Sequence, residues 1–406
     1  MKKLFLINVS ANSGSTGRIA EEIGQTAMQH GYESYFAYGR TSRTSKSHLI
    51  RIGNDLDIKI HGIESRLFDN HGFSSRRATR KLIEEIERIR PDVINLHNVH
   101  GYYLNVEILF NYLATRQIPV VWTLHDCWPF TGHCAHFMRI GCEKWKTACH
   151  HCENIGRYPK SWMDNSARNF QKKKALFIRL QNLTFVSPCQ WMADCLGDSF
   201  LKDHPSKVIY NGTDLEVFRP YAANDIQPLK NAYGLNGKKI ALGVTNVWQQ
   251  AKGWDDLMKL SEMLPDDFRL VMIGLTDKQL TELPKNIVGL KRTENVQELA
   301  KWYSLADVFV NPTYVDNFPT TNIEALACGT PVVTYNTGGS PEAVDEKTGI
   351  VVEQSNIQQL KSAIGNMASH KEACSAECRK RAEMCFDKKA RFEDYVGLFD
   401  RVCGNY

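Results

Sequence analysis

Short apolar runs alternate with helical patterns along the first half of the chain. The runs at 4–9, 92–96 and 183–187 each precede a segment with helical spacing, and the run at 119–124 ends in a loop. Alternation of this kind is typical of a parallel sheet with helices on both faces. The first half therefore predicts a doubly wound α/β domain.

The same alternation repeats in the second half, with apolar runs at 239–244, 268–274, 306–312, 331–335 and 349–353. The segment 218–238 between the two sets is rich in Pro, Gly and Asn, which favours a linker. We predict two Rossmann-like doubly wound domains, 1–217 and 218–385, whose strand ends face a shared cleft. The segment 386–406 holds a final amphipathic helix, with Phe392, Tyr395, Val396 and Phe399 at helical spacing.

Composition and charge narrow the class of protein only slightly. The 406 residues are 43% hydrophobic and 23% charged, and the formal net charge of +5 is too small to indicate nucleic acid. The apolar start at 4–9 is too short for a signal peptide, and no run is long enough to span a bilayer. We expect a cytoplasmic protein whose 12 cysteines are reduced.

One segment combines two carboxylates with a helix start. It is YVDNFPTTNIEALACGTPVV, residues 314–333, and we expect its helix to run from about Thr320 to Cys328. The first backbone amides of a helix lack internal acceptors and attract anions, so the amides of Thr320, Thr321 and Asn322 suit a diphosphate. Glu324 could accept from a ribose diol, and Asp316 from a neighbouring sugar. The plain alternative is a solvated helix Glu and a turn Asp.

The segment resembles the acidic signature of the retaining GT-B glycosyltransferases of family 4. Five other segments agree with that family in order and place: SGSTGR (13–18), TLHD (123–126), VIYNGTDLEVFRP (208–220), KGWDDLMKLSEML (252–264) and TGGSPEAV (337–344). The resemblance covers essentially the whole chain and is strongest to the capsule and exopolysaccharide branch. It implies a GT-B fold whose last helix crosses back to the first domain.

The resemblance also implies roles for single residues. Lys252, with Asn246, would hold the donor phosphates, and the loop with Gly14 and Gly17 would approach the diphosphate and the acceptor. His125 would contact the donor sugar, although a histidine at a strand end is often only structural.

Two departures from the family bear on this assignment. The first acid is Asp316, where the family usually has Glu, and the Arg that often precedes Lys252 is absent. We take His125, Asp316 and Lys252 as the candidate catalytic residues. The resemblance implies retention at the anomeric carbon, with no metal or other cofactor in the chemistry.

The expected function is transfer of a sugar from a nucleotide-diphosphate donor to a glycan or a polyprenyl-diphosphate-linked acceptor, in surface polysaccharide biosynthesis. A nucleotide-sugar epimerase and a zinc-stabilised, non-catalytic nucleotide-sugar-binding protein are the alternatives. Basic clusters at Arg76, Arg77, Arg80 and Lys81 and at 172–174 predict either solvated helix faces or a peripheral contact with lipid headgroups on the inner face of the membrane.

The loop 127–160 concentrates cysteines without a clear helix or strand pattern. Cys134, Cys142, Cys149 and Cys152 include a C-x-x-C pair, a common half of a zinc site, and nearby histidines offer substitutes. A loop this long needs something to hold it. We predict a structural zinc ion on these four thiolates, with an iron–sulfur cluster or simply buried cysteines as alternatives.

Overall fold

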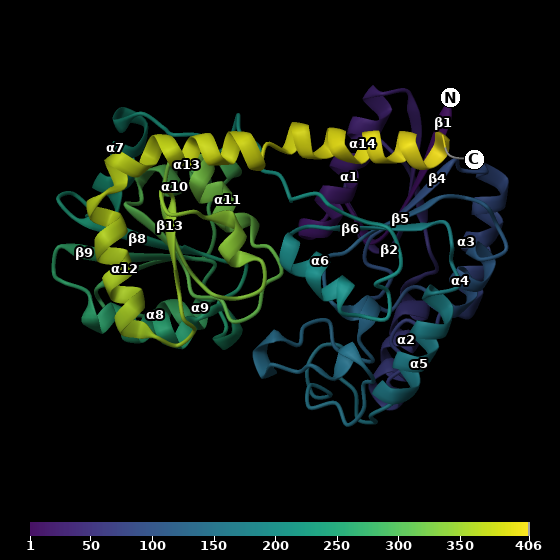
Figure 1. Ribbon diagram of the computed structural model, residues 1–406. Helices are drawn as coiled ribbons and strands as arrows, with labels where there is room; N and C mark the ends of the chain where they lie inside the picture. The colour runs from purple at the N-terminus through teal and green to yellow at the C-terminus, as the bar shows by residue number, and fades with distance from the viewer. Residues whose placement is uncertain (405–406) are drawn as a thin grey trace. The chain divides into compact units, whose positions relative to one another are not determined.

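The computed structural model describes residues 1–404, which form two compact units (Figure 1). The N-terminal unit comprises Met1–Ile209 together with the chain from Arg391 onward, and the C-terminal unit comprises Tyr210–Ala390. No helix in residues 1–404 is both long enough and apolar enough to cross a membrane. The last two residues of the segment predicted at 386–406 lie outside the described residues.

The N-terminal unit is built on a seven-stranded sheet with the order β3-β2-β1-β4-β5-β6-β7, in which every paired strand is parallel. Its order reverses between β1 and β4, where parallel sheets usually bind ligands. The strands are β1 Lys2–Ala11, β2 Tyr32–Ser42, β3 His48–Arg51, β4 Val93–Leu96, β5 Val120–Thr123, β6 Leu183–Ser187 and β7 Ser206–Val208. The helices are α1 Gly14–Gln29, α2 Asp55–Phe68, α3 Arg76–Ile89, α4 Val106–Leu113, α5 Ser166–Phe177 and α6 Gln190–Gly197, with short 3-10 turns η1 Trp128–Phe130, η2 Met138–Ile140 and η3 Lys144–Lys146.

The C-terminal unit has a six-stranded parallel sheet in the order β10-β9-β8-β11-β12-β13, which reverses between β8 and β11. The strands are β8 Lys239–Val244, β9 Phe268–Ile273, β10 Ile287–Leu290, β11 Val308–Asn311, β12 Val332–Tyr335 and β13 Gly349–Val352. The helices are α7 Ala223–Ala232, α8 Trp254–Met263, α9 Asp277–Glu282, α10 Val296–Leu305, α11 Thr320–Ala327, α12 Ile357–Ser369 and α13 Lys371–Cys385, with 3-10 turns η4 Gln250–Lys252 and η5 Ser340–Ala343. The last helix, α14 Lys388–Gly404, lies mostly in the N-terminal unit.

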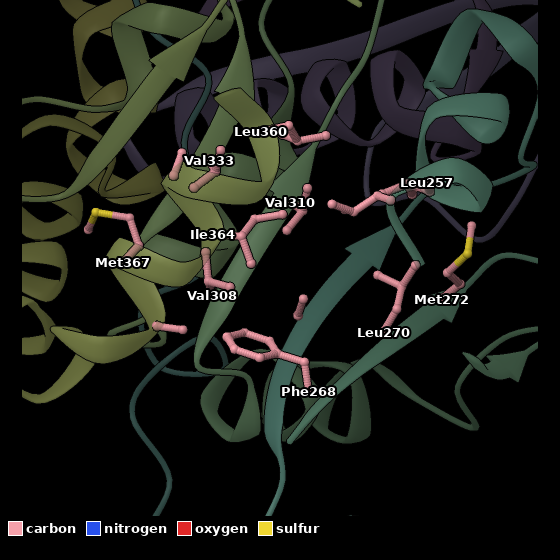
Figure 2. Close-up of a cluster of buried hydrophobic side chains, with 14 of the residues drawn as sticks. Leu257, Phe268, Leu270, Met272, Val308, Val310, Val333, Leu360, Ile364 and Met367 are labelled. Carbon is pink, nitrogen blue, oxygen red and sulfur yellow. The ribbon is translucent and has the colours of Figure 1, made fainter. Parts of the chain in front are cut away.

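Each sheet is covered by apolar helix faces. In the C-terminal unit, Val308, Val310 and Val333 of the central strands pack with Leu257 of α8 and Ile364 of α12 (Figure 2). In the N-terminal unit, α14 contributes its apolar face to the cluster around β1 and α1, through Phe392, Tyr395, Val396 and Phe399. The alternation of apolar runs along the chain therefore correctly predicts two Rossmann-like parallel-sheet units.

The structure corrects two local expectations. The segment 218–238, expected to be a linker, contains α7. In the basic cluster at 172–174, Lys173 is buried, so the cluster is not one solvated face. Consecutive residues of a helix point in different directions, which explains why Lys173 is buried while Lys172 and Lys174 are exposed.

Candidate functional site

In the C-terminal unit, the loops that follow β8 and β11 are held together at the point where the strand order reverses. The backbone N–H of Tyr314 donates to the carbonyl of Ala251 at 3.0 Å. Gly253 has a φ of 81°, and a Cβ there would lie 2.3 Å from the carbonyl oxygen of Pro312. Only glycine allows this approach. The Lys-Gly pair thus places Lys252 against the loop that carries Asp316.

Lys252 and Asp316 form an ion pair in this loop. The Lys252 Nζ lies 2.7 Å from Asp316 Oδ2 and donates to the carbonyl of Val315 at 2.9 Å. Their side chains are 32% and 24% exposed, so a ligand can reach both. A Cβ on Gly338 would come within 2.1 Å of the Asp316 carbonyl oxygen, so this glycine lets the 337–344 segment support the acid.

Helix α11 begins directly after this loop, and its first amides differ in availability. The amides of Thr320 and Thr321 have no acceptor within residues 1–404, as expected of a helix start. The Asn322 amide donates to the Pro319 carbonyl at 3.2 Å. The Asn322 side chain is fully buried and accepts from Asn311 Nδ2 at 2.8 Å. Asn322 therefore fixes the helix to β11, and of the three amides predicted to bind an anion, those of Thr320 and Thr321 remain for it.

Glu324 lies one turn further along α11 and is oriented by a tyrosine. The Tyr303 hydroxyl donates to Glu324 Oε2 at 2.9 Å, and the Tyr303 ring is fully buried. Burial, together with the nearby Glu324 carboxylate, raises the pKa of Tyr303 well above its ordinary value, so it remains a donor. Sequence reasoning missed Tyr303, since it falls within the apolar pattern of α10. Asn246 lies exposed after the end of β8.

In the N-terminal unit, a chain of hydrogen bonds connects the ends of β4 and β5. Asn95 Nδ2 donates to the Val121 carbonyl at 2.9 Å, so its Oδ1 accepts from His97 Nε2 at 3.0 Å. His97 Nδ1 then accepts from His125 Nε2 at 2.9 Å. This order assigns the tautomers and leaves Nδ1 of His125 as an acceptor. His97 is a buried orienting residue, a role the sequence did not indicate.

Burial keeps both of these histidines neutral. It lowers the pKa of His97 well below its ordinary value, where the neighbouring His125 adds to the effect, and it lowers the pKa of His125 to about 4. The next residue in the sequence is Asp126, whose Oδ2 accepts a hydrogen bond from His100 Nε2 at 2.8 Å. Although burial raises the pKa of Asp126, His100 and the other donors outweigh it and bring that pKa to about 2.

The glycine loop after β1 is shaped by contacts inside the unit. A Cβ on Gly17 would lie 2.7 Å from the Ser10 carbonyl oxygen, whereas Gly14 has a φ of 70° and open space around it. Asn8, fully buried, donates to the Ser10 carbonyl at 2.8 Å. Gly17 is thus required by close packing, and only Gly14 faces space that a ligand could enter.

The cysteine-rich loop brings some of its thiols together. Cys134 and Cys152 lie close enough that the Cys152 side chain raises the pKa of Cys134 well above its ordinary value, and Cys149 Sγ accepts from the Gly132 amide at 3.2 Å. Cys142 is half-buried nearby. Within residues 1–404, no three or more His, Cys, Asp or Glu side chains are arranged so that they could hold a metal ion. Zinc binding would therefore need the side chains of this loop to draw closer.

Lys173 of α5 holds the start of the same loop. Its Nζ is buried, donates to the carbonyls of Trp128 and Thr131 at 2.7 and 3.0 Å, and lies 3.4 Å from the centre of the Trp128 ring. Next to it, His133 Nδ1 contacts Asp69 Oδ1 at 2.6 Å. These contacts fix the part of the loop from 128 to 133 without any metal.

The protein has two doubly wound units, and the second unit has carboxylates at the start of helix α11. This combination is that of the GT-B class of glycosyltransferases. Comparison with known proteins agrees with this class. Residues 16–217 match the family described as Glycosyltransferase Family 4, and residues 238–370 match Glycosyl transferases group 1. The chain therefore belongs to the glycosyltransferases, with a family 4 domain followed by a group 1 domain.

Relatives and solved structures extend the comparison over the full chain. The chain is 26% identical to the putative colanic acid biosynthesis glycosyl transferase WcaC of Escherichia coli K12, covering 98% of this chain and 100% of that protein. It is 28% identical to a D-inositol 3-phosphate glycosyltransferase of Mycobacteroides abscessus over 49% of this chain and 47% of that protein. A sucrose-phosphate synthase from Thermosynechococcus elongatus has the same fold, with a TM-score of 0.72 at 17% identity and 100% coverage of both chains.

Proposed function

We propose that this glycosyltransferase transfers a hexose, with retention, from a nucleoside-diphosphate sugar to a glycan or a polyprenyl-diphosphate-linked acceptor in surface polysaccharide biosynthesis. The observation that carries the proposal is the grouping of Lys252, Asp316 and Glu324 at the start of α11. The likeness to WcaC along its whole length supports the polysaccharide part, because that protein is named for colanic acid biosynthesis.

The donor diphosphate would be held by a lysine ammonium group and by backbone amides that have no acceptor within the helix. Lys252 would turn from Asp316 to the phosphate oxygens, beside the amides of Thr320 and Thr321. Negative charge grows on the diphosphate as the glycosidic bond breaks, and fixed donors stabilise that charge more in the transition state than in the ground state. This arrangement lowers the barrier to departure of the nucleotide without a metal ion.

The two carboxylates would hold the two sugars of the donor. Glu324, already oriented by Tyr303, would accept from the ribose diol, and Asp316, once released by Lys252, would accept from the transferred hexose. In the N-terminal unit, the neutral His125 stays a proposed sugar contact, as the resemblance to the family implies. No group in this assignment acts as a glycosidase acid, because one of the carboxylates is committed to the ribose.

A panel of nucleotides tests the donor site first. Melting temperature is measured with UDP, GDP, ADP and TDP, and the nucleotide that binds should stabilise the protein by about 2–3 kcal/mol at 100 times its Kd. The matching nucleoside-diphosphate hexoses are then tested for release of the free nucleotide. No stabilisation by any nucleotide would refute the proposed donor site.

Product analysis separates the proposal from its alternatives. With a competent acceptor, the coupling constant of the new anomeric proton should match the configuration of the donor, as retention requires. Isomerised donor without transfer would indicate an epimerase, and binding without nucleotide release would indicate a non-catalytic protein. An inverted product would refute retention.

A further inference from the structure

A chain of hydrogen bonds leads from the end of β5 to the cysteine-rich loop of the N-terminal unit. Asp126 Oδ1 accepts from the Trp128 amide at 2.9 Å, and Asp126 Oδ2 accepts from His100 Nε2 at 2.8 Å. The other ring nitrogen of His100, Nδ1, lies 3.3 Å from the hydroxyl oxygen of Tyr158. The side chains of His100 and Asp126 are buried, whereas Tyr158 is 50% exposed. The chain therefore connects a buried carboxylate to a tyrosine that a ligand can reach.

The carboxylate sets the direction of each hydrogen bond in this chain. Because the pKa of Asp126 is about 2, its carboxyl group is ionised near neutral pH and can only accept. Neutral His100 must then carry its hydrogen on Nε2 and present a lone pair at Nδ1, which accepts from the Tyr158 hydroxyl. Tyr158 has no other hydrogen-bond partner in residues 1–404. Its oxygen therefore offers lone pairs only, which suits a ligand that donates a hydrogen bond.

Tyr158 lies in a group of aromatic rings that includes a strained backbone. Its ring centre is 5.5 Å from that of His71 and 6.4 Å from that of Tyr102. Tyr102 has a φ of 72°, which is uncommon for a residue other than glycine, and the Gly101 amide before it donates to His71 Nε2 at 3.1 Å. His71 Nδ1 is buried without a hydrogen-bond partner in the part of the chain that the structure describes. Strained residues cluster at ligand sites, and an unpaired buried polar atom is rare elsewhere.

The hydrogen-bonded chain also lies beside His125, the proposed sugar contact. His100 adds to the effect of burial in lowering the pKa of His125, so the two side chains are neighbours. His100 follows β4 and His125 follows β5. The strand order reverses between β1 and β4, where parallel sheets usually bind ligands. Tyr158 is thus connected to the ligand-binding end of the sheet.

We propose that Tyr158 contacts the acceptor and accepts a hydrogen bond from one of its sugar hydroxyl groups, with His100 and Asp126 as positioning residues that fix the direction of this bond. The inference rests on the proposed function and adds a specificity residue to it. It also restricts the ligand, because an ionised phosphate has no hydrogen to donate. The group that Tyr158 holds therefore belongs to a sugar and not to a diphosphate, and the cysteine-rich loop takes part in the choice of acceptor.

Reversing the direction of the hydrogen bonds tests the chain without any ligand. In Asp126→Asn, the Trp128 amide retains the side-chain oxygen, so the new NH2 group faces His100 Nε2. His100 must then accept at Nε2 and donate from Nδ1, which turns the Tyr158 hydrogen outward. Nitrogen-15 NMR, with the His100 signals identified by their loss in His100→Gln, should show Nε2–H in wild type and Nδ1–H in Asp126→Asn. The same tautomer in both proteins would overturn the proposal.

Transfer kinetics test the contact with the acceptor. The acceptors are the octyl glycosides of glucose, galactose and N-acetylglucosamine, used with the nucleoside-diphosphate hexose from which wild type releases nucleotide. Tyr158→Phe should lower kcat/KM for the acceptor about 3–10-fold through loss of one hydrogen bond, and calorimetry should show unchanged affinity for the nucleoside diphosphate. Tyr35→Phe, which removes a hydroxyl bonded to Glu33 on β2, is the matched control and should behave as wild type does.

A double variant separates this role from a structural one. Asp126→Asn acts through the Tyr158 hydroxyl, so it should lower kcat/KM for the acceptor by itself but change it less than about twofold when Tyr158→Phe is already present. Losses that simply multiply would overturn the proposal, as would a wild type that releases nucleotide but transfers to none of the three glycosides. A wild type that binds no nucleotide would overturn the proposed function and the acceptor role together, whereas the NMR result depends on neither.

Discussion

The Lys252 ammonium group bonds the Asp316 carboxylate when no ligand is present, so removing that carboxylate has two opposite effects. Asp316→Asn should lower turnover by about 10–100-fold through loss of a charge-assisted hydrogen bond to the hexose. It should leave nucleoside-diphosphate affinity unchanged or raised, because Lys252 no longer has to leave an ion pair. Calorimetry with the nucleotide and a turnover assay measure the two effects, and a parallel loss of both would remove Asp316 from the sugar side.

Lys252→Ala makes the complementary change. It should weaken binding of the nucleoside diphosphate by roughly 10-fold or more, the effect of losing one charge-assisted contact, and spare the nucleoside. Calorimetry with nucleoside and diphosphate forms of the same base measures this. Equal affinities in wild type and variant would show that Lys252 does not hold the phosphates.

Tyr303 offers a milder test of the ribose assignment. Tyr303→Phe keeps the buried ring and removes only the hydroxyl that orients Glu324, so nucleoside affinity should fall by about 0.5–1.5 kcal/mol. Tyr233→Phe is the matched control, since Tyr233 also packs on α10 but contacts the Trp302 ring. If both variants bind the nucleoside as wild type does, the orientation of Glu324 by Tyr303 does not matter for binding.

Among single elements, α5 contains three consecutive lysines with different surroundings. Lys173→Ala would leave the carbonyls of Trp128 and Thr131 without their buried donor and open a cavity, which should lower the free energy of unfolding by about 2–4 kcal/mol. Lys174→Ala, on the exposed side, should change it by less than ~0.5 kcal/mol. Urea unfolding measures both, and equal effects would mean that the loop does not depend on Lys173.

We retain the metal site in the cysteine-rich loop as a proposal. We propose that Cys134, Cys142, Cys149 and Cys152 bind one structural zinc ion, supported by the contact of Cys134 with Cys152. Elemental analysis should find about one zinc per chain. Cys149→Ser or a chelator should lower the melting temperature, whereas Cys374→Ser on α13 should not. Metal-free protein purified without chelators, with every thiol titratable, would contradict the proposal.

Pattern alone located most elements and the acidic helix start, because buried strands and amphipathic helices have distinct periods. It could not separate Lys173 from its neighbours, since burial of one lysine depends on carbonyls supplied by a distant loop. The same limit applies to Tyr303, His97 and Asn322, whose roles arise from partners on other elements. Helix α2 misleads pattern analysis in another way, because it buries His61 and Ser65 while Leu56, Ile60 and Ile63 are exposed.

Across the whole molecule, titratable histidines are unevenly distributed. Every histidine except His370 lies in the N-terminal unit. Burial lowers the pKa of His61 and of His125 to about 4, below the value near 6.5 in an unfolded chain. Unfolded protein therefore binds more protons as pH falls from about 6.5 towards 4, and stability is lost in that window.

Acidification should consequently weaken one unit before the other. Between pH 7 and pH 5, each of these two histidines should cost the N-terminal unit about 1–2 kcal/mol of unfolding free energy. Hydrogen–deuterium exchange, corrected for the intrinsic effect of pH, should show reduced protection on β4 and β5 and little change on β8 and β11. Equal loss in the two units would contradict the histidine explanation.

The return of α14 to the N-terminal unit affects how the chain folds as it leaves the ribosome. The core around β1 and α1 includes Phe392, Tyr395, Val396 and Phe399, so this unit lacks part of its interior until the last helix is synthesised. The C-terminal unit has all its residues by Ala390. The unit that is translated first is therefore completed only after the C-terminal unit has been made, and its partly exposed sheet must wait, during synthesis, for α14.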